Sequence, residues 1–212
     1  MSQISQSNAY IFRITHIDNV PWILRNGFQC RNSPNRDPNF REIGNPDLIG
    51  KRQHRLVPTG PGGTLSDYVP FYFTPHSPML LNIKTGYNGM RQTPMPDIAI
   101  FVSSLPHVAN QGLPFVFTDR HAYPVAAQYF TEMQRLDAID WKILQTRDFK
   151  RDPNDIGKVE RYMAEALIHR HVPLSALLGV ACYGPEPETR LLGMQADAGV
   201  SLKTVVKQDW YF

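Results

Sequence analysis

Proline is the residue that most restricts how this chain can fold. Of its 212 residues, 18 are proline, against roughly 5% in an average protein, and they lie between short apolar runs such as Ile98–Val102. Proline interrupts both helices and central strands. This spacing therefore predicts many short strands joined by ordered loops, and it argues against a bundle of long helices.

The composition is typical of one globular domain. Hydrophobic residues make up 42% of the chain and charged residues 19%, with a mean hydropathy of −0.33, which excludes a disordered chain. The apolar runs are too short to cross a bilayer, and residues 1–8 lack the basic start and apolar stretch of a signal peptide. Two cysteines, Cys30 and Cys182, provide neither a disulfide framework nor a zinc site. We therefore expect a single domain over residues 1–212, no membrane partner and a cytoplasmic location.

Local patterns predict an α+β fold with helices before and after the strands. The expected strands are Tyr10–Ile14, Phe28–Gln29, Tyr68–Thr74, Ile98–Val102, Phe115–Phe117, Ala166–Ile168 and Leu178–Cys182. The expected helices lie between Asn19 and Gly27 and over Pro46–Arg55, Pro124–Glu132 and Ile156–Ala164.

Three segments have a composition suited to binding a ligand, and each also has a simpler explanation. Arg13–His16 joins a strand to a helix, where free backbone groups suit a polar ligand; alternatively, His16 only bonds the turn. Lys51–Arg55 is the densest basic cluster in a chain of net charge +3, and it either holds a pyrophosphate or forms a solvated face. The aromatic residues of Tyr72–Met79 either belong to the core or stack on flat rings.

Two acidic residues near the end of the fourth expected helix differ in their setting. Glu160 lies where that helix is exposed, whereas Glu165 directly precedes an apolar strand. A carboxylate at the head of a buried strand is unfavourable unless it has a function or a partner. Glu165 is therefore a candidate functional residue, and the alternative is that it pairs with Arg161 or Arg170.

Common motifs of nucleotide-binding and hydrolytic enzymes are absent. The sequence contains no G-x-x-x-x-G-K-[ST], G-x-G-x-x-G, G-x-S-x-G or H-E-x-x-H. His169 and His171 lie two residues apart and would point to opposite faces of a strand. We expect no metal site.

Four longer segments, taken in order, resemble a known family. They read ITHIDNVPWILRNGF, GGTLSDYVPFYFTPHSPM, GLPFVFTDRHA and AEALIHRHVP, and they are similar to segments of the DarT family of DNA ADP-ribosyltransferase toxins. The resemblance spans residues 8–185. It implies an ADP-ribosyltransferase-like fold with central split antiparallel β-sheets, peripheral helices and a long substrate-recognition loop.

The resemblance also implies a function. A member of this family is a toxin that transfers ADP-ribose from NAD to a base in single-stranded DNA, thymine in the larger subfamily. It acts in a sequence-specific manner and blocks replication. The implied partners are single-stranded DNA and a macrodomain antitoxin.

Catalytic residues follow from the matched positions. The family's NAD-binding element corresponds to residues 35–55, and its catalytic arginine corresponds to Arg52, with Lys51 and Arg55 as alternatives in the register. The catalytic glutamate corresponds to Glu165 in AEALI. Cleavage of the nicotinamide–ribose bond builds positive charge on the ribose, which a carboxylate at the ribose hydroxyl stabilises. Arginine is a poor general base, so we expect its role to include stabilisation of the anion that develops on the base.

Binding residues are implied in the same way, over a substrate-recognition loop at residues 117–165. Arg13 stands where relatives carry histidine, so only its backbone contacts carry over. The residues expected to bind NAD are Arg13, Ile14, Thr15, His16, Asn19, Trp22, Arg52 and Tyr72. The residues expected to contact DNA are Pro75, His76, Ser77, Met79, His121, Lys150, Arg151, Arg161 and Tyr162.

Alternative functions remain open at this point. The acceptor can be guanine in DNA, or it can be RNA or protein. From a different class, the chain can be an inactive module that binds single-stranded nucleic acid. Incubation with labelled NAD separates the enzyme from the inactive module.

Overall fold

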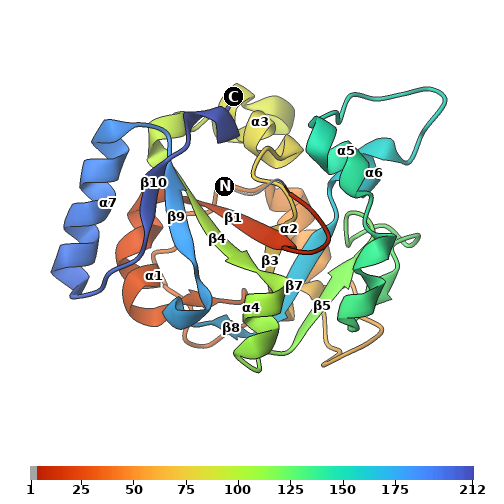
Figure 1. The fold of residues 1–212 in the computed structure, drawn as a ribbon, viewed down its shortest axis with the longest axis horizontal. Helices are drawn as coiled ribbons and strands as arrows, with labels where there is room; N and C mark the ends of the chain where they lie inside the picture. The colour runs from red at the N-terminus through yellow and green to blue at the C-terminus, as the bar shows by residue number, and fades with distance from the viewer. Residues whose placement is uncertain (1–3) are drawn as a thin grey trace.

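The computed structural model describes residues 4–212, in which an eight-stranded sheet lies between helices and a second, two-stranded sheet lies beside it (Figure 1). The strands are β1 (Tyr10–His16), β2 (Phe28–Gln29), β3 (Tyr68–Tyr72), β4 (Ile98–Ser104), β5 (Phe115–Thr118), β6 (Tyr129–Phe130), β7 (Glu165–His169), β8 (His171–Val172), β9 (Gly179–Cys182) and β10 (Thr204–Val206).

The α-helices of residues 4–212 are short, and five of these seven carry a proline in their first turn, where its missing N–H costs nothing. They are α1 (Val20–Asn26), α2 (Pro46–Arg52), α3 (Pro78–Thr85), α4 (Leu105–Asn110), α5 (Trp141–Thr146), α6 (Lys158–Tyr162) and α7 (Pro185–Ala198). None of the helices within residues 4–212 has the length and apolar character needed to cross a membrane.

The large sheet is divided near its middle. Its strand order is β10-β9-β4-β1-β3-β7-β5-β6, and all pairs are antiparallel except β9 with β10. β1 pairs with β4 along its whole length but with β3 only at Phe12 and Tyr72. The sheet thus consists of two four-stranded halves that separate beside this pair, which confirms the expected α+β fold with a split antiparallel sheet.

Alternating side chains of the central strands enter two different cores. Ile11 and Phe101 pack in one core together with residues of α1, α4 and α7, whereas Phe12 and Ile100 pack in another with residues of α3 and with Trp210. Because helices or loops cover both faces, β4 is buried along its whole length, as expected for a continuous apolar run.

All seven expected strands form, but several other elements were not expected, among them the short helices α3, α4 and α5. The helix expected over Pro124–Glu132 is wrong: β6 forms there instead, with Tyr129 and Phe130 pairing with β5, and the backbone of Gln128 donates to the Asp119 carboxylate at 2.9 Å. Helix α7, the longest in the described chain, was not anticipated. It packs beside α1 at the β9–β10 end of the sheet (Figure 1).

Candidate active site

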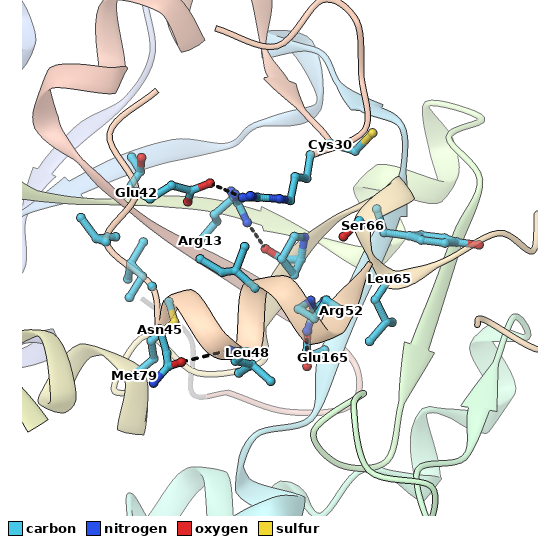
Figure 2. A pocket seen from close by; sticks show the side chains of 18 of the residues that line it. Arg13, Cys30, Glu42, Asn45, Leu48, Arg52, Leu65, Ser66, Met79 and Glu165 are labelled. Carbon is cyan, nitrogen blue, oxygen red and sulfur yellow. Dashed lines mark hydrogen bonds and ion pairs between the residues drawn. The ribbon is translucent and has the colours of Figure 1, made fainter. Parts of the chain in front are cut away.

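A cleft opens where the two halves of the sheet separate (Figure 2). Its walls come from β1, residues 29–45, α2 and β3, and Glu165 lies in it at the head of β7. The empty space, including the part open to solvent, is about 1030 Å³. The split in the sheet therefore creates a candidate ligand site that Glu165 and Arg52 both line.

Glu165 is a buried carboxylate with three partners. Its side chain is 1% exposed. Arg52 Nη1 donates to Oε1 at 3.2 Å and to Oε2 at 3.0 Å, and the Ala122 backbone N–H donates to Oε1 at 3.0 Å. Burial opposes ionisation, but Arg52, His121 and the Ala122 N–H outweigh it and hold the pKa of Glu165 below its usual 4.5. Its ionised form thus stabilises the fold above pH 4.5, and this contribution is lost as the pH falls through the lowered pKa.

His121 faces the same carboxylate as a neutral ring. Its Nε2 lies 3.7 Å from Glu165 Oε1, and its Nδ1 accepts from the Tyr123 backbone N–H at 3.3 Å. With Nδ1 as acceptor, the proton of the neutral ring lies on Nε2 and points toward the carboxylate. Burial lowers the pKa of His121, and Glu165 only partly opposes this effect, so the ring stays uncharged at neutral pH.

Helix α2 carries Arg52 to Glu165. The Asn45 side chain accepts from the Leu48 N–H at 3.0 Å and so caps the start of α2, and Arg52 is its last residue. Arg52 Nη2 is buried and has no hydrogen-bond partner among residues 4–212. Of the three basic candidates only Arg52 reaches Glu165: Lys51 is exposed, and Arg55 Nη2 instead donates to the Pro124 carbonyl at 3.1 Å.

Arg13 joins the two halves of the sheet beside the cleft. Its Nη1 donates to the Pro70 carbonyl of β3 at 2.7 Å, and its guanidinium lies 5.0 Å from the centre of the Phe28 ring. Burial lowers the pKa of Arg13 to about 10, so it remains charged at neutral pH. It also lines the cleft, which adds positive charge opposite α2.

Several buried polar atoms of the cleft have no hydrogen-bond partner within residues 4–212. They are Arg13 Nε, Arg52 Nη2 and Ser66 Oγ, and all three residues line the cleft. Buried polar atoms are nearly always hydrogen-bonded in folded proteins. These atoms therefore suit a ligand that brings phosphate and hydroxyl oxygens, and a dinucleotide such as NAD provides both.

The structure separates the residues expected to bind NAD into two groups. Those that line the cleft are Arg13, Ile14, Thr15, Arg52 and Tyr72. His16, Asn19 and Trp22 are not among its lining. His16 Nδ1 accepts from the Asp18 N–H at 3.1 Å, and the Asn19 amide donates to Thr15 Oγ1 at 3.0 Å and to the Arg41 carbonyl at 2.9 Å. Asn19 thus holds the wall of the cleft in place, and direct contact of these three residues with NAD stays a prediction.

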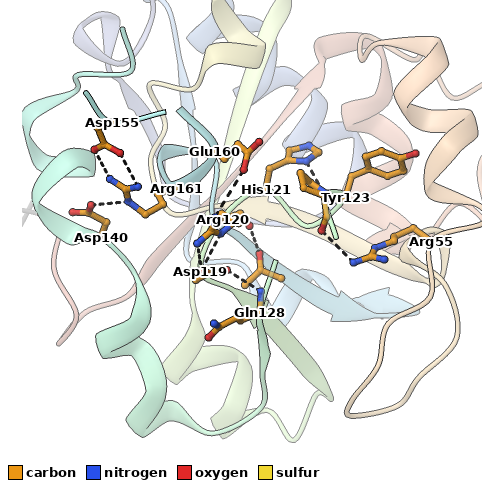
Figure 3. A network of polar contacts seen from close by, with 12 residues as sticks. Arg55, Asp119, Arg120, His121, Tyr123, Gln128, Asp140, Asp155, Glu160 and Arg161 are labelled. Carbon is orange, nitrogen blue, oxygen red and sulfur yellow. Dashed lines mark hydrogen bonds and ion pairs between the residues drawn. The ribbon is translucent and has the colours of Figure 1, made fainter. Parts of the chain in front are cut away.

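Residues expected to contact DNA lie both inside and outside the cleft. Met79 and His121 line it, and the Tyr72 hydroxyl donates to Met79 Sδ at 3.8 Å. Lys150 and Arg151 lie exposed on the segment between α5 and α6. Arg161 is held by the carboxylates of Asp140 and Asp155 (Figure 3).

The remaining expected DNA contacts are more buried than the sequence indicated. Ser77 accepts from the Leu80 N–H at 3.2 Å and caps α3, and Pro75 is buried. The His76 ring lies 3.9 Å from the ring of Phe212. Tyr162 is 0% exposed, and its hydroxyl donates to the His76 carbonyl at 2.9 Å. This placement corrects the expectation for Tyr162, because a fully buried ring has no face for a DNA base; it supports the segment that carries His76.

Two parts of the site were missed by sequence reasoning. Ala122 contributes only its backbone N–H to Glu165, and no side-chain pattern signals such a role. Glu42 lines the cleft and accepts from Arg31 Nη1 at 3.0 Å and from Arg36. The available signal for Glu42 was an acidic residue that follows several arginines in the irregular segment.

A split sheet with a buried glutamate at its opening, and with an arginine and unpaired donors facing the same cleft, defines an ADP-ribosyltransferase-type site. The sequence model of the family described as DarT, ssDNA thymidine ADP-ribosyltransferase, matches residues 12–212. The chain belongs to this family, and it is an NAD-dependent DNA ADP-ribosyltransferase.

Individual relatives agree with this assignment. A DNA ADP-ribosyl transferase of Escherichia coli O127:H6 is 50% identical over 211 residues, covering 100% of this chain and 97% of that protein. One from Thermus sp. (strain 2.9) is 35% identical over 204 residues, covering 95% of each. Solved structures of Thermus sp. 2.9 DarT superpose with a TM-score of 0.88 in complex with ADP-ribosylated ssDNA and 0.83 in complex with NAD+. These two structures are 32% and 33% identical to this chain and cover 97% of it.

Proposed function

We propose that this chain modifies thymine in single-stranded DNA, with Glu165 and Arg52 as its catalytic residues. The observation that carries the proposal is the buried Glu165–Arg52 pair at the opening of the split sheet. Bound NAD supplies the ADP-ribosyl group, with nicotinamide as the leaving group. The roles below are those that the protein's own side chains can perform.

Glu165 would orient the ribose and stabilise its charge. Its carboxylate is ionised at neutral pH and is held from two sides by Arg52 and the Ala122 N–H. A fixed carboxylate stabilises positive charge that develops on the sugar in the transition state, with little cost of reorganisation. The neutral His121 ring faces the same carboxylate, with Nε2 3.7 Å from Oε1, and does not neutralise it.

Arg52 would act on the acceptor base. One of its terminal nitrogens is engaged by Glu165, while Nη2 has no partner within residues 4–212. As the ring nitrogen of thymine bonds to the ribose and the nicotinamide–ribose bond breaks, the nitrogen releases its proton to solvent in the open cleft. A guanidinium N–H beside it stabilises the negative charge that develops. Met79 and Tyr72 would provide the surface against which the base lies.

The direct test is mass spectrometry of oligonucleotides of varied sequence after incubation with the protein and NAD. We expect an added ADP-ribosyl group on thymine in a single strand and much less in a duplex, because pairing hides the base. Modification of guanine, of RNA or of added protein in preference to thymine would assign a different acceptor. Varying the neighbouring bases in the same experiment measures the expected sequence specificity.

NAD should raise the melting temperature of the protein, because a ligand that binds only the folded state stabilises it by mass action. At 100 times the dissociation constant the gain is about 2.7 kcal/mol. Thermal unfolding with and without NAD measures it, and adenosine serves as a control that lacks the pyrophosphate. Absence of a shift at millimolar NAD would count against the cleft as the donor site.

Lys150 and Arg151 should contribute to DNA affinity through contacts with phosphates. The slope of log affinity against log salt changes by about 0.7 for each phosphate contact to a single strand. We expect the Lys150→Gln/Arg151→Gln variant to show weaker binding and a shallower slope. The control variant, Arg25→Gln/Lys203→Gln, removes two exposed charges on α1 and beside β10, away from the cleft lining. Equal slopes for the two variants would place the DNA elsewhere.

The proposal extends to the biological setting implied by the family resemblance. Modified thymine in a single strand would block replication, so the enzyme would act as a toxin in the compartment that holds the DNA. A macrodomain antitoxin is the corresponding partner. Co-expression with such a protein should restore growth that this chain alone suppresses.

A further inference from the structure

We infer that Tyr129 and Arg55 are positioning residues that set the catalytic geometry of Glu165 through the loop between β5 and β6. The inference rests on the proposed catalytic role of Glu165. This loop, residues 119–128, carries the Ala122 N–H that binds the carboxylate. The side chains of Tyr129 and Arg55, from outside the loop, hold it, and Figure 3 shows Arg55 beside it.

Tyr129 acts on the same residue that binds Glu165. Its hydroxyl donates to the Ala122 carbonyl at 2.5 Å, while the Ala122 N–H donates to Glu165 Oε1 at 3.0 Å. The position of Tyr129 is itself fixed, because β6 pairs with β5 at Thr118 and the ring packs against the core formed by Val116, Leu167 and their neighbours. A short chain of hydrogen bonds therefore runs from β6 to the carboxylate.

Arg55 holds the same loop from the other side. Its Nη2 donates to the Pro124 carbonyl at 3.1 Å, and it lies beside the Tyr129 hydroxyl, whose pKa it helps to lower against the larger effect of burial. The Arg55 backbone N–H donates to the Arg52 carbonyl at 3.3 Å. The short segment 52–55 thus makes two contacts. Arg52 binds Glu165 directly, and Arg55 binds the loop whose Ala122 N–H also donates to Glu165.

This arrangement links both polar contacts of the carboxylate to one segment of chain. If the 52–55 segment shifts, Arg52 and the Ala122 N–H move together relative to Glu165. The other titratable or polar groups facing the carboxylate are His121 on the same loop and Tyr72 on β3. Neither of them hydrogen-bonds the Ala122 carbonyl within residues 4–212, so the Tyr129 hydroxyl is the group that holds this peptide.

The test compares Tyr129→Phe with Tyr123→Phe. Tyr123 lies on the same loop and packs against the same core, but its hydroxyl makes no hydrogen bond within residues 4–212. We expect Tyr129→Phe to lower kcat for thymine modification about tenfold and to leave NAD affinity unchanged. A tenfold decrease corresponds to a rise in the activation free energy of about the size of one hydrogen bond. Tyr123→Phe should retain wild-type kcat.

The pH profile separates positioning from loss of folded protein. Loosening the Ala122 N–H removes one cause of the low pKa of Glu165, so the acid limb of kcat should move to higher pH in Tyr129→Phe. The pH at which kcat falls to half does not depend on the fraction of protein that is folded and active. If Tyr129→Phe has the same acid limb and the same kcat as Tyr123→Phe, the inference is wrong. If the wild-type protein is inactive, the proposed function itself is wrong.

Arg55 provides the second, independent variant. Arg55→Lys keeps a donor for the Pro124 carbonyl and should retain most of the activity, whereas Arg55→Met should lose kcat and shift the acid limb as Tyr129→Phe does. If Arg55→Met and Arg55→Lys behave alike, Arg55 has no positioning role. Melting curves of all variants with and without NAD complete the comparison.

Discussion

The Glu165→Gln variant should lose about 100- to 1,000-fold or more in the rate of ADP-ribosyl transfer, as expected when a preorganised electrostatic group is removed from an active site. Its affinity for NAD should change little, because the carboxylate acts on charge that develops only in the transition state. Glutamine keeps the shape and an acceptor for the Ala122 N–H. Single-turnover assays on a thymine-containing strand measure the rate, and calorimetry measures NAD binding.

The choice of glutamine follows from the burial of the pair. Arg52 is 12% exposed and Glu165 is 1% exposed, and removing one partner of a buried pair typically costs about 3–5 kcal/mol of stability. Both substitutions remove the charge, but glutamine keeps an acceptor oxygen for Arg52 and the Ala122 N–H, whereas Glu165→Ala leaves both donors unpaired and confounds catalysis with unfolding. Glu160→Gln is the matched control, since that carboxylate is 43% exposed and lies 4.0 Å from Arg120, where exposed pairs contribute about 0–1 kcal/mol. Loss of activity in Glu160→Gln with retention in Glu165→Gln would show that the catalytic acid was assigned wrongly.

Local features of the fold were predictable where residues close in the sequence determine the structure. Pro21 begins α1 and Gly27 ends it at φ +68°, where an added Cβ would lie 2.2 Å from the Val172 carbonyl. The continuous apolar run of β4 also formed where it was expected. The structure of the segment over Pro124–Glu132 could not be predicted from its own residues. Tyr129 and Phe130 form a strand because they pair with β5, and strand formation depends on such tertiary contacts more than on local propensity.

The site was predictable in part, for a related physical reason. Glu165 was conspicuous because a carboxylate beginning an apolar strand needs a partner, but the sequence suggested Arg161 or Arg170 rather than Arg52, which lies 113 residues away. Arg161 instead binds Asp140 and Asp155. Long-range pairs depend on how strands are ordered in the sheet, and backbone donors such as that of Ala122 leave no trace in residue type.

The Arg52→Lys variant should retain the fold and lose about 100-fold or more in transfer rate, an effect comparable to removal of one transition-state donor. Lysine keeps a positive charge beside Glu165, so the buried carboxylate is still compensated. However, one ammonium group cannot bind both carboxylate oxygens and also present a second donor to the base, as the planar guanidinium does. The rate is measured on a thymine-containing single strand, and the melting temperature reports the fold.

Lys51→Arg is the control for this substitution, because it makes the reverse change at the neighbouring, exposed position of α2. It should retain wild-type activity. In the double variant Lys51→Arg/Arg52→Lys, the guanidinium is displaced by one residue, about 100° around a helix, and points away from Glu165. Activity close to that of the wild type in the double variant would mean that a basic group anywhere at this end of α2 suffices. Activity as low as in Arg52→Lys would require the guanidinium at position 52, where Nη1 contacts Glu165 and Nη2 remains available to the acceptor.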